Sequence, residues 1–480
     1  MRHSLFIKLI LVFILILPVI PGHSQTDIAA GDVSGTWLLA DSPFHVNGNI
    51  TIPDGETLII EPGVEVIFTG QYNLDIKGRL LAEGNKQDSI RFTAQNAGTG
   101  WNGIDFINTP AANDSSKLVY CQLTSANALG TFPLNCGGAI LSSGVSKILI
   151  SNCLIDNNYA GYVGGGICLG YGASPEIRNN IISNNFAPWG GGIGIVNNCN
   201  PLIMNNIIIH NKCNELGGGV QINQTSNPVL INNTIAFNRA GQGGGIDCRD
   251  NSDPSIINTI LFGNTASDGN QVCLYVTNCD PDFYNCCIDG GLDDFGGPGS
   301  GENFTGVYEN NLDCNPRFMD AAADDYHLSA LSSCIGAGAD SIQIGDLWYY
   351  PPSTDFEGSP RSCPAGSAPD IGALENASGN PVTEVLSTQY QIPLSCRLMQ
   401  NHPNPFNPVT SINYELPADN HVIISVYNSS GREVQRLVNE QQKAGHYTLY
   451  WDASEQTSGL YILHVSVGSF RKSIKMILMK

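Results

Sequence analysis

Short runs in which apolar residues alternate with other residues fill the middle of the chain, as in Ile167 to Leu169 and Val220 to Ile222. An alternation with a period of two indicates a β-strand with one buried face. Glycine, asparagine and proline separate the runs, and these residues favour turns. The pattern therefore predicts many short strands joined by tight corners, and few helices.

The strands recur every 26 or 27 residues, and three rows of residues mark this period. The rows are Gly137, Gly164, Gly190, Gly217 and Gly243; Asn158, Asn185, Asn211, Asn238 and Asn264; and Pro175, Pro201, Pro228, Pro254 and Pro281. So short a strand pairs with the equivalent strand of the next repeat, in parallel sheets with rungs about 4.8 Å apart. We therefore predict an all-β fold, a right-handed parallel β-helix of about nine or ten coils.

The asparagine row predicts a structural ladder at one corner of the coils. Asparagine tolerates the left-handed backbone conformation of a tight corner better than other non-glycine residues do. Stacked side-chain amides can also hydrogen-bond from one coil to the next. We expect the whole row, from Asn158 to Asn264, to have this structural role rather than a chemical one.

The stretch 36–125 continues the pattern with longer and less regular coils. Its segments 48–52 (GNITI), 58–64 (LIIEPGV) and 101–104 (WNGI) resemble the opening coils of bacterial right-handed β-helix proteins with the pectin lyase-like fold. The resemblance covers roughly residues 35–290 and implies the fold. It implies no activity, because lyases, adhesins and other proteins share this architecture.

From about residue 290 the period breaks. The segments 315–318, 325–328, 335–338, 355–361 and 370–375 together resemble the closing region of choice-of-anchor β-helix surface proteins. We therefore predict a β-helix domain over 25–375 whose atypical end caps the last open sheet edge. The aspartates and histidine of this end leave Ca²⁺ binding open as a second role.

Residues 376–396 have no sustained pattern and are expected to form a linker. The following segment, 397–480, contains six or seven short alternating strands, which predicts a small β-sandwich. A general immunoglobulin-like binding module is one interpretation of such a domain.

The motifs of this last segment resemble the type IX secretion sorting domain of Bacteroidetes and related bacteria. They are 404–408 (NPFNP), 422–427 (VIISVY), 446–452 (HYTLYWD), 459–462 (GLYI) and the basic end 472–480. Asp452 is followed by Ala453 where the family usually has glycine. The resemblance implies recognition by the type IX machinery, export, and removal of the tail as the protein is attached to the cell surface or released.

The first residues, 1–24, predict a signal peptide that is cleaved after Ser24. Arg2 and Lys8 precede an apolar run over 9–20, which is shorter than the roughly 20 residues that span a bilayer. No later segment is apolar enough to be a membrane anchor. We therefore expect a secreted, extracellular protein, monomeric, with attachment to the outer cell surface left open.

The chain carries a formal net charge of −21, with the acidic excess in 26–396. Such a surface repels phosphate backbones, so nucleic acid is excluded as a partner. The 15 cysteines leave at least one unpaired, and several are expected in the coil interior as small apolar residues. No pair has the spacing of a zinc site, so no thiolate metal site is predicted.

One row of side chains suggests a binding surface. Tyr159, Phe186, Lys212 and Arg239 directly follow the asparagine row and should stack facing outward, with Trp189 and His210 close by. Exposed aromatic and basic side chains along a straight sheet suit a linear polysaccharide or surface glycan. Alternatively, the aromatic side chains pack under a loop.

The sequence assigns no residue to catalysis, because it contains no nucleophile elbow, phosphate loop or metalloprotease motif. A second outward row holds a single carboxylate, which argues against a paired-carboxylate hydrolase. This row is Cys168, Gly194, Gln221, Asp247 and Cys273. Three functions stay open: a glycan-binding surface protein, a lyase or glycoside hydrolase acting on an acidic polysaccharide, and a structural spacer or adhesin.

Overall fold

The computed structural model describes residues 25–276, 278–377, 396–401, 404–454, 456–468 and 470–480. The predicted signal peptide and most of the predicted linker lie outside these residues. The chain divides into two compact units, Met1–Pro381 and Val382–Lys480. Within the described residues, no helix is long and apolar enough to cross a membrane.

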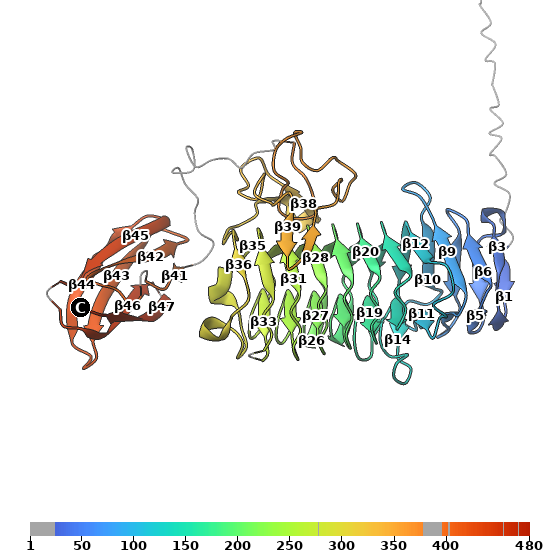
Figure 1. Ribbon diagram of the computed structural model, residues 1–480, viewed down its shortest axis with the longest axis horizontal. Helices are drawn as coiled ribbons and strands as arrows, with labels where there is room; N and C mark the ends of the chain where they lie inside the picture. Colours follow the sequence, from blue (N-terminus) through green and yellow to red (C-terminus); the bar gives the residue numbers. More distant parts are fainter. Residues whose placement is uncertain (1–24, 277, 378–395, 402–403, 455, 469) are drawn as a thin grey trace, which may run out of the picture. The chain divides into compact units, whose positions relative to one another are not determined.

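Three parallel sheets run along the first unit (Figure 1). Sheet A contains β1 (Thr26–Ile28), β4 (Phe44–Val46), β7 (Glu65–Phe68), β10 (Ile90–Ala94), β13 (Cys121–Thr124), β17 (Leu154–Asp156), β21 (Ile181–Ser183), β25 (Ile207–Ile209), β29 (Thr234–Ala236), β32 (Ile260–Phe262) and β35 (Cys287–Ile288). Sheet B contains β2 (Gly31–Asp32), β5 (Ile50–Ile52), β8 (Leu74–Ile76), β11 (Ile104–Ile107), β15 (Ile140–Ser143), β19 (Ile167–Gly170), β23 (Ile193–Ile195), β27 (Val220–Ile222), β30 (Ile246–Cys248) and β33 (Val272–Leu274). Sheet C contains β3 (Gly35–Trp37), β6 (Thr57–Ile60), β9 (Arg79–Glu83), β12 (Ser116–Val119), β16 (Ile148–Ser151), β20 (Glu176–Arg178), β24 (Leu202–Met204), β28 (Val229–Ile231), β31 (Ser255–Ile257), β34 (Asp282–Tyr284) and β36 (Tyr308–Glu309).

This arrangement confirms the predicted right-handed parallel β-helix. Sheets A and C each have 11 strands, more than the nine or ten coils predicted. The first strands, β1, β2 and β3, bury Trp37 alone and so lack the alternation from which coils were counted. A 3₁₀ turn, η1 (Leu39–Asp41), follows these opening strands.

Stacked apolar rows fill the interior of the β-helix. In sheet A the inward residues pair in register from coil to coil, and each is fully buried. They are Phe92, Leu123, Ile155, Ile182, Ile208, Ile235, Leu261 and Ile288. Cysteines share this core, as predicted, and none of the 15 is in a disulfide.

A ladder of buried asparagines holds the corner that follows sheet A. The Nδ2 atom of Asn185 donates to Oδ1 of Asn211 at 3.0 Å, and Asn211 donates in the same way to Asn238. Each Oδ1 also accepts the backbone N–H of the asparagine one coil earlier. The same bonds extend the ladder to Asn158 and Asn264, so the amides stack as the sequence predicts.

The left-handed conformation lies one position earlier than predicted. Asn157, Asn184, His210 and Phe237, each directly before a ladder asparagine, have φ between 53° and 56°. This residue turns the chain outward, and the next one then points into the coil. The ladder asparagines are therefore selected for their buried amide and not for their backbone conformation.

A second asparagine ladder, which the sequence interpretation missed, holds the corner between sheets C and A. Asn180 donates to Asn206 at 2.9 Å and Asn206 donates to Asn233 at 3.1 Å. Left-handed asparagines again precede these residues and point outward. This ladder is also marked in the sequence, because the pairs Asn179-Asn180, Asn205-Asn206 and Asn232-Asn233 repeat at the period of the coils.

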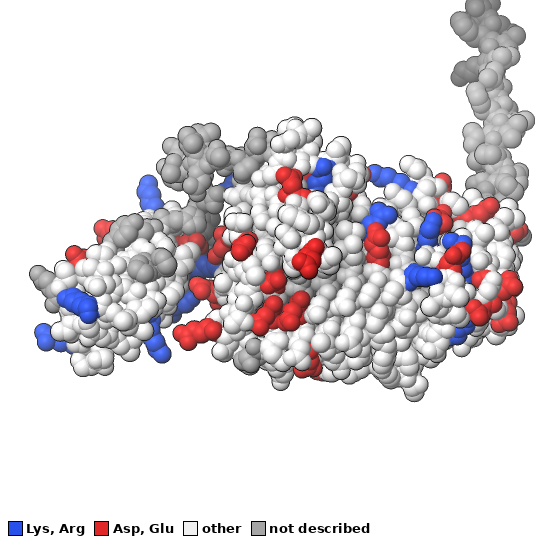
Figure 2. All heavy atoms as spheres, viewed as in Figure 1, with Lys and Arg blue, Asp and Glu red and all other residues white. Residues whose placement is uncertain are grey.

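Acidic side chains gather over the last coils (Figure 2). Part of this charge lies at the exposed third corner, where a side-chain oxygen of one coil accepts a backbone N–H of the next. Asn227 bonds to the N–H of Asp253 in this way, and Asp253 to that of Asp280. Carboxylates therefore replace amides in the same structural position.

Residues 291–309 close the end of the β-helix, through η2 (Gly291–Asp294), η3 (Gly301–Asn303) and β36. Phe295 and Tyr308 pack on Phe283 of the last full coil, with ring centroids 5.2 and 6.2 Å away. The cap is thus formed by residues 291–309, which precede the segments 315–375 for which capping was predicted.

The rest of the closing region, residues 318–375, lies against the side of the β-helix and not beyond its end (Figure 1). It contains β37 (Phe318–Asp320), η4 (Ala321–Ala323), β38 (Asp325–Leu328), β39 (Ile342–Ile344) and β40 (Leu347–Tyr349). Tyr326 and Leu374 pack on the outer side chains of Ile207 and Ile209 in sheet A. Strand β25 is thus apolar on both faces, as a covered parallel strand should be.

The outward asparagines of the second corner bind this closing segment, here defined as residues 318–375. Asn205 donates to the carbonyl of Thr354 at 2.7 Å, and Asn232 donates to that of Asp370 at 3.0 Å. Asn258 both donates to and accepts from Ala339. In each asparagine pair, therefore, the second residue bonds inside the coil and the first residue bonds to the closing segment outside it.

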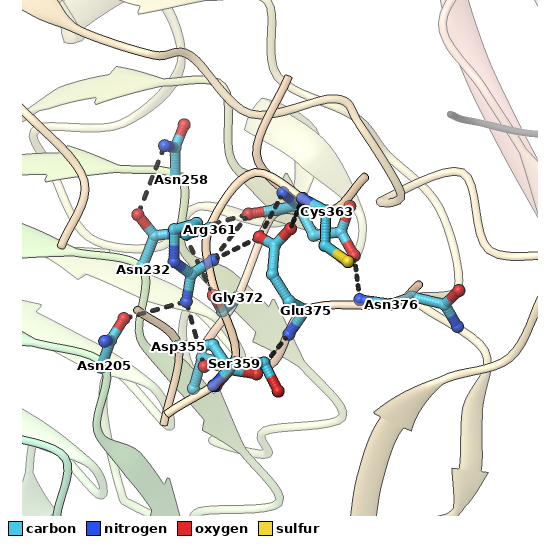
Figure 3. A network of polar contacts seen from close by, with 12 residues as sticks. Asn205, Asn232, Asn258, Asp355, Ser359, Arg361, Cys363, Gly372, Glu375 and Asn376 are labelled. Carbon is cyan, nitrogen blue, oxygen red and sulfur yellow. Dashed lines mark hydrogen bonds and ion pairs between the residues drawn. The ribbon is translucent and has the colours of Figure 1, made fainter. Parts of the chain in front are cut away.

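An ion pair at the centre of the closing segment joins two of the motifs seen in the sequence (Figure 3). Arg361 lies 2.9 Å from Glu375, and both side chains are 1% exposed. Arg361 also donates to Asn205 of the β-helix at 3.0 Å. Asp355 and Asp370 accept backbone N–H groups on both carboxylate oxygens, so these two aspartates are poor candidates for the Ca²⁺ site left open above.

The second unit is a two-sheet sandwich, as predicted. One sheet contains β41 (Arg397–Leu398), β42 (Val409–Leu416) and β45 (Gly445–Asp452); the other contains β44 (Glu433–Gln442), β43 (Asn420–Asn428), β46 (Gly459–Val467) and β47 (Phe470–Leu478). Trp451 and Phe406 lie in the core between the sheets. Ala453, which replaces the usual glycine, is buried there and its N–H bonds to Pro408.

Truncation of the ladder should destabilise the whole β-helix. Asn211→Ala removes the acceptor of the buried Asn185 backbone N–H, and it removes one of the two acceptors of the Asn185 amide. It also takes away one of the two donors to Oδ1 of Asn238 and the side-chain donor to the carbonyl of Ile182. We expect a loss of about 2–4 kcal/mol in the free energy of unfolding, measured by urea denaturation of the mature chain. Lys212→Ala, an exposed neighbour, is the control and should change stability by less than about 0.5 kcal/mol. Equal stability of the two variants would contradict the role of the ladder.

Candidate functional site

The predicted binding row exists as a row in the structure. A short parallel sheet, the corner sheet, contains β14 (Asn127–Ala128), β18 (Tyr159–Ala160), β22 (Phe186–Trp189) and β26 (Lys212–Leu216). Tyr159, Phe186, Lys212 and Arg239 are register partners across it. The ring of Tyr159 stacks on that of Phe186 at 5.4 Å, and Tyr159 is 37% exposed.

His210 does not belong to this row. Its left-handed backbone places it on the other side of the corner from Lys212, next to sheet A. There its Nε2 lies 3.1 Å from Oδ1 of Asp324 and 3.2 Å from the hydroxyl of Tyr326. The imidazole therefore contacts the closing segment and lies apart from the row of Tyr159, Phe186, Lys212 and Arg239.

Trp189 lies close to the row, as predicted from its position on the same strand, but β22 shifts register between Ala187 and Trp189. Its indole lines a cavity of about 250 Å³ together with residues of neighbouring coils. We call this cavity the aromatic pocket. Its lining residues are Phe132, Pro133, Cys136, Leu141, Ser143, Tyr162, Val163, Cys168, Gly170, Tyr171, Trp189, Val196, Asn197, Asn223 and Gln224.

Three aromatic rings form one side of the aromatic pocket. The Tyr162 ring lies 4.9 Å from that of Trp189, and the Phe132 ring lies 6.3 Å from that of Tyr162, nearly perpendicular to it. The indole Nε1 of Trp189 donates to Glu215 at 2.8 Å, which fixes the orientation of the ring. Tyr171, 57% exposed, also lines the cavity.

The coil repeat positions the central pair of rings. Tyr162 precedes Trp189 by one coil, and the N–H of Trp189 bonds to the carbonyl of Tyr162. The spacing of one coil between Tyr162 and Trp189 is visible in the sequence, so Tyr162 could have been predicted to lie beside Trp189. Phe132 could not be found in this way, because it stands on a loop inserted in the long coil between Leu123 and Ile155.

The chemistry of the aromatic pocket is apolar with amides at its edge. The side chains of Asn197 and Gln224 line it from turns with left-handed backbone. Cys136 and Cys168 also line it, and the hydrogen bond between them raises the thiol pKa of Cys168 well above its usual range, together with burial, and lowers that of Cys136. Among the described lining residues there is no carboxylate, imidazole, amine or guanidinium.

The second predicted outward row is covered by other residues. All five of its members, Cys168 to Cys273, are buried. They point away from the β-helix interior, but the adjacent corner lies over them: a Cβ on Gly194 would be 2.3 Å from Val163. Asp247 there pairs with Arg249 at 2.7 Å, and burial raises its pKa to about 6.

Comparison with known proteins identifies both parts of the chain. Residues 90–259 match the family described as the right handed beta helix region. Residues 401–479 match the family described as the secretion system C-terminal sorting domain, over nearly all of the second unit. The chain is a β-helix protein exported by the type IX secretion system. This β-helix protein therefore reaches the extracellular space or the cell surface.

Individual relatives add little to this assignment. The β-helix protein is 31% identical over 71 residues to Protein bark beetle of Drosophila melanogaster, which is 15% of the chain and 2% of the length of that relative. The enzymatically active domain of tailspike protein 4 from bacteriophage CBA120 is similar with a TM-score of 0.35 and 12% identity. That match covers 94% of the chain and 63% of the tailspike chain. Neither relative carries an activity over to this chain.

One buried carboxyl in sheet B gives the β-helix protein a predictable dependence on pH. Asp105 is 2% exposed, and burial raises its pKa to about 7, although Asn73 donates to it at 2.7 Å. The folded state thus keeps this proton up to about pH 7, whereas the unfolded carboxyl loses it near pH 4. The folded state is therefore stabilised at low pH, and this contribution is lost as the pH rises from about 4 to 7.

Asp105→Asn should remove the loss of stability that occurs as the pH rises, because the amide does not ionise. The free energy of unfolding of the variant relative to the natural chain should rise by about 2 kcal/mol between about pH 5 and pH 8, measured by urea denaturation. Asp346→Asn, at an exposed aspartate, is the control. Parallel stability curves for Asp105→Asn and the natural chain would show that Asp105 ionises normally.

Proposed function

We propose that the exported β-helix binds a glycan in the aromatic pocket. The observation that carries this proposal is the set of rings formed by Phe132, Tyr162 and Trp189 around one cavity, with the amides of Asn197 and Gln224 at its edge. Aromatic rings cover the apolar face of a sugar, and side-chain amides bond to its hydroxyl groups. A cavity of about 250 Å³ suits one or two sugar units.

The pocket favours binding over cleavage. Glycoside hydrolysis needs two carboxyl groups beside the scissile bond, and lyases need a base close to the sugar. The described residues that line the pocket include no pair of carboxyl groups, and no lysine, arginine or histidine that could act as the base. The hydrolase and lyase alternatives therefore have less support than a binding protein.

The corner sheet extends the proposed surface. Strand β22 carries Phe186 in the outward row and Trp189 in the pocket, so a ligand longer than the pocket can contact both. Lys212 and Arg239 are exposed in this row and would favour an acidic sugar there. The preferred ligand is thus an oligosaccharide with a neutral unit in the pocket and a uronate beside the basic pair.

Loss of the indole should abolish tight binding. We expect Trp189→Ala to raise the dissociation constant at least tenfold, because it removes the ring that a sugar would stack on. A glycan array on the mature chain identifies the ligand, and calorimetry then compares the variants. Trp348→Ala is the matched control, since Trp348 is 54% exposed on β40 of the closing segment. Equal binding by both variants, or no glycan signal for the natural chain, would refute the proposal.

The sorting domain should be necessary for surface delivery. Deletion of residues 397–480 removes the whole second sandwich and leaves the β-helix core intact. We expect the truncated protein to accumulate in the periplasm, detected by cell fractionation and by protease treatment of whole cells. Surface display at the level of the full chain would contradict this assignment. We also infer that the domain is cleaved on export, which shortens the surface form by roughly 9 kDa.

A further inference from the structure

Three cysteine thiols converge where the last coil meets the closing segment. Cys287 belongs to β35, Cys314 to the chain that leaves the last coil, and Cys334 to the closing segment. Their Sγ atoms all lie within 4.8 Å of one another, and those of Cys287 and Cys314 are 3.4 Å apart. Cys287 and Cys334 are fully buried, while Cys314 is partly exposed.

The distances between the three sulfur atoms are those expected around a bound metal ion. Metal–thiolate bonds of about 2.3 Å place the sulfurs of a trigonal site about 4 Å apart, within the range seen here. Leu328, Ile335 and Ile371 surround the three thiols with apolar side chains. A dry site made of three sulfur ligands selects a soft cation.

We propose that Cys287, Cys314 and Cys334 form a binding site for one Cu(I) ion. Cu(I) accepts three thiolates as a complete ligand set, whereas Zn²⁺ takes a fourth ligand, and among the described residues no further cysteine, histidine or carboxylate joins this cluster. The bound ion joins the β-helix to the closing segment. The sequence predicted no thiolate site because the three ligands come from separate elements and lack the close spacing of a zinc motif.

The test is an anaerobic titration of the reduced, mature full-length chain with Cu(I), in competition with the chelator bathocuproine disulfonate. We expect one chelator-resistant Cu(I) per chain and a higher melting temperature when it is bound. Cys314→Ser should weaken retention at least 100-fold and abolish the thermal shift. Cys363→Ser, at a partly exposed cysteine outside the cluster, should behave like the natural chain.

Three results would overturn the proposal. The first is the absence of chelator-resistant Cu(I) on the natural chain. The second is equal retention by Cys314→Ser while its circular dichroism matches that of the natural chain. The third is a disulfide between any two of the three cysteines, found by mass spectrometry of exported protein that is alkylated without reduction.

Discussion

The hydrogen bond between stacked asparagine side chains is the constraint on which the rest of the structure depends. Each ladder amide accepts the backbone N–H of one neighbouring asparagine and donates to the next, as Asn185 does between Asn158 and Asn211. A buried amide left without these partners would cost more than the bond itself contributes. The corner therefore tolerates no slip in register. This fixed register places Tyr162, one coil earlier, beside Trp189, and the two rings then line the aromatic pocket.

The residue before each ladder position connects the coil with its surroundings. Its left-handed backbone directs the side chain outward, where Asn205 and Asn232 hold the closing segment and His210 meets Asp324. The left-handed residue and the ladder asparagine that follows it thus have separate roles: the asparagine forms hydrogen bonds inside the coil, and the residue before it binds the closing segment outside. The apolar outer face of strands such as β25 then becomes part of a second core.

Features that repeat along the chain could be predicted from the sequence, and features that occur once could not. The coils, the first ladder and the Tyr159–Arg239 row recur at a fixed period, so a one-dimensional pattern determines their neighbours. The side-on position of the closing segment, the Phe132 loop and the cysteine cluster depend on contacts between segments far apart in the sequence. The exact directions of the Trp189 and His210 side chains could not be predicted either, because they depend on a register shift in one strand and on a left-handed corner.

A preformed pocket on a rigid stack should bind its ligand without rearrangement, because the ladder holds the rings in place before binding. A crystal structure of the mature protein with a bound oligosaccharide tests this claim most directly. The account predicts a sugar ring stacked against Trp189 and Tyr162, with the asparagine ladder in the same conformation as in the ligand-free protein. A sugar bound elsewhere on the chain, or an aromatic pocket closed by its own side chains, would contradict it.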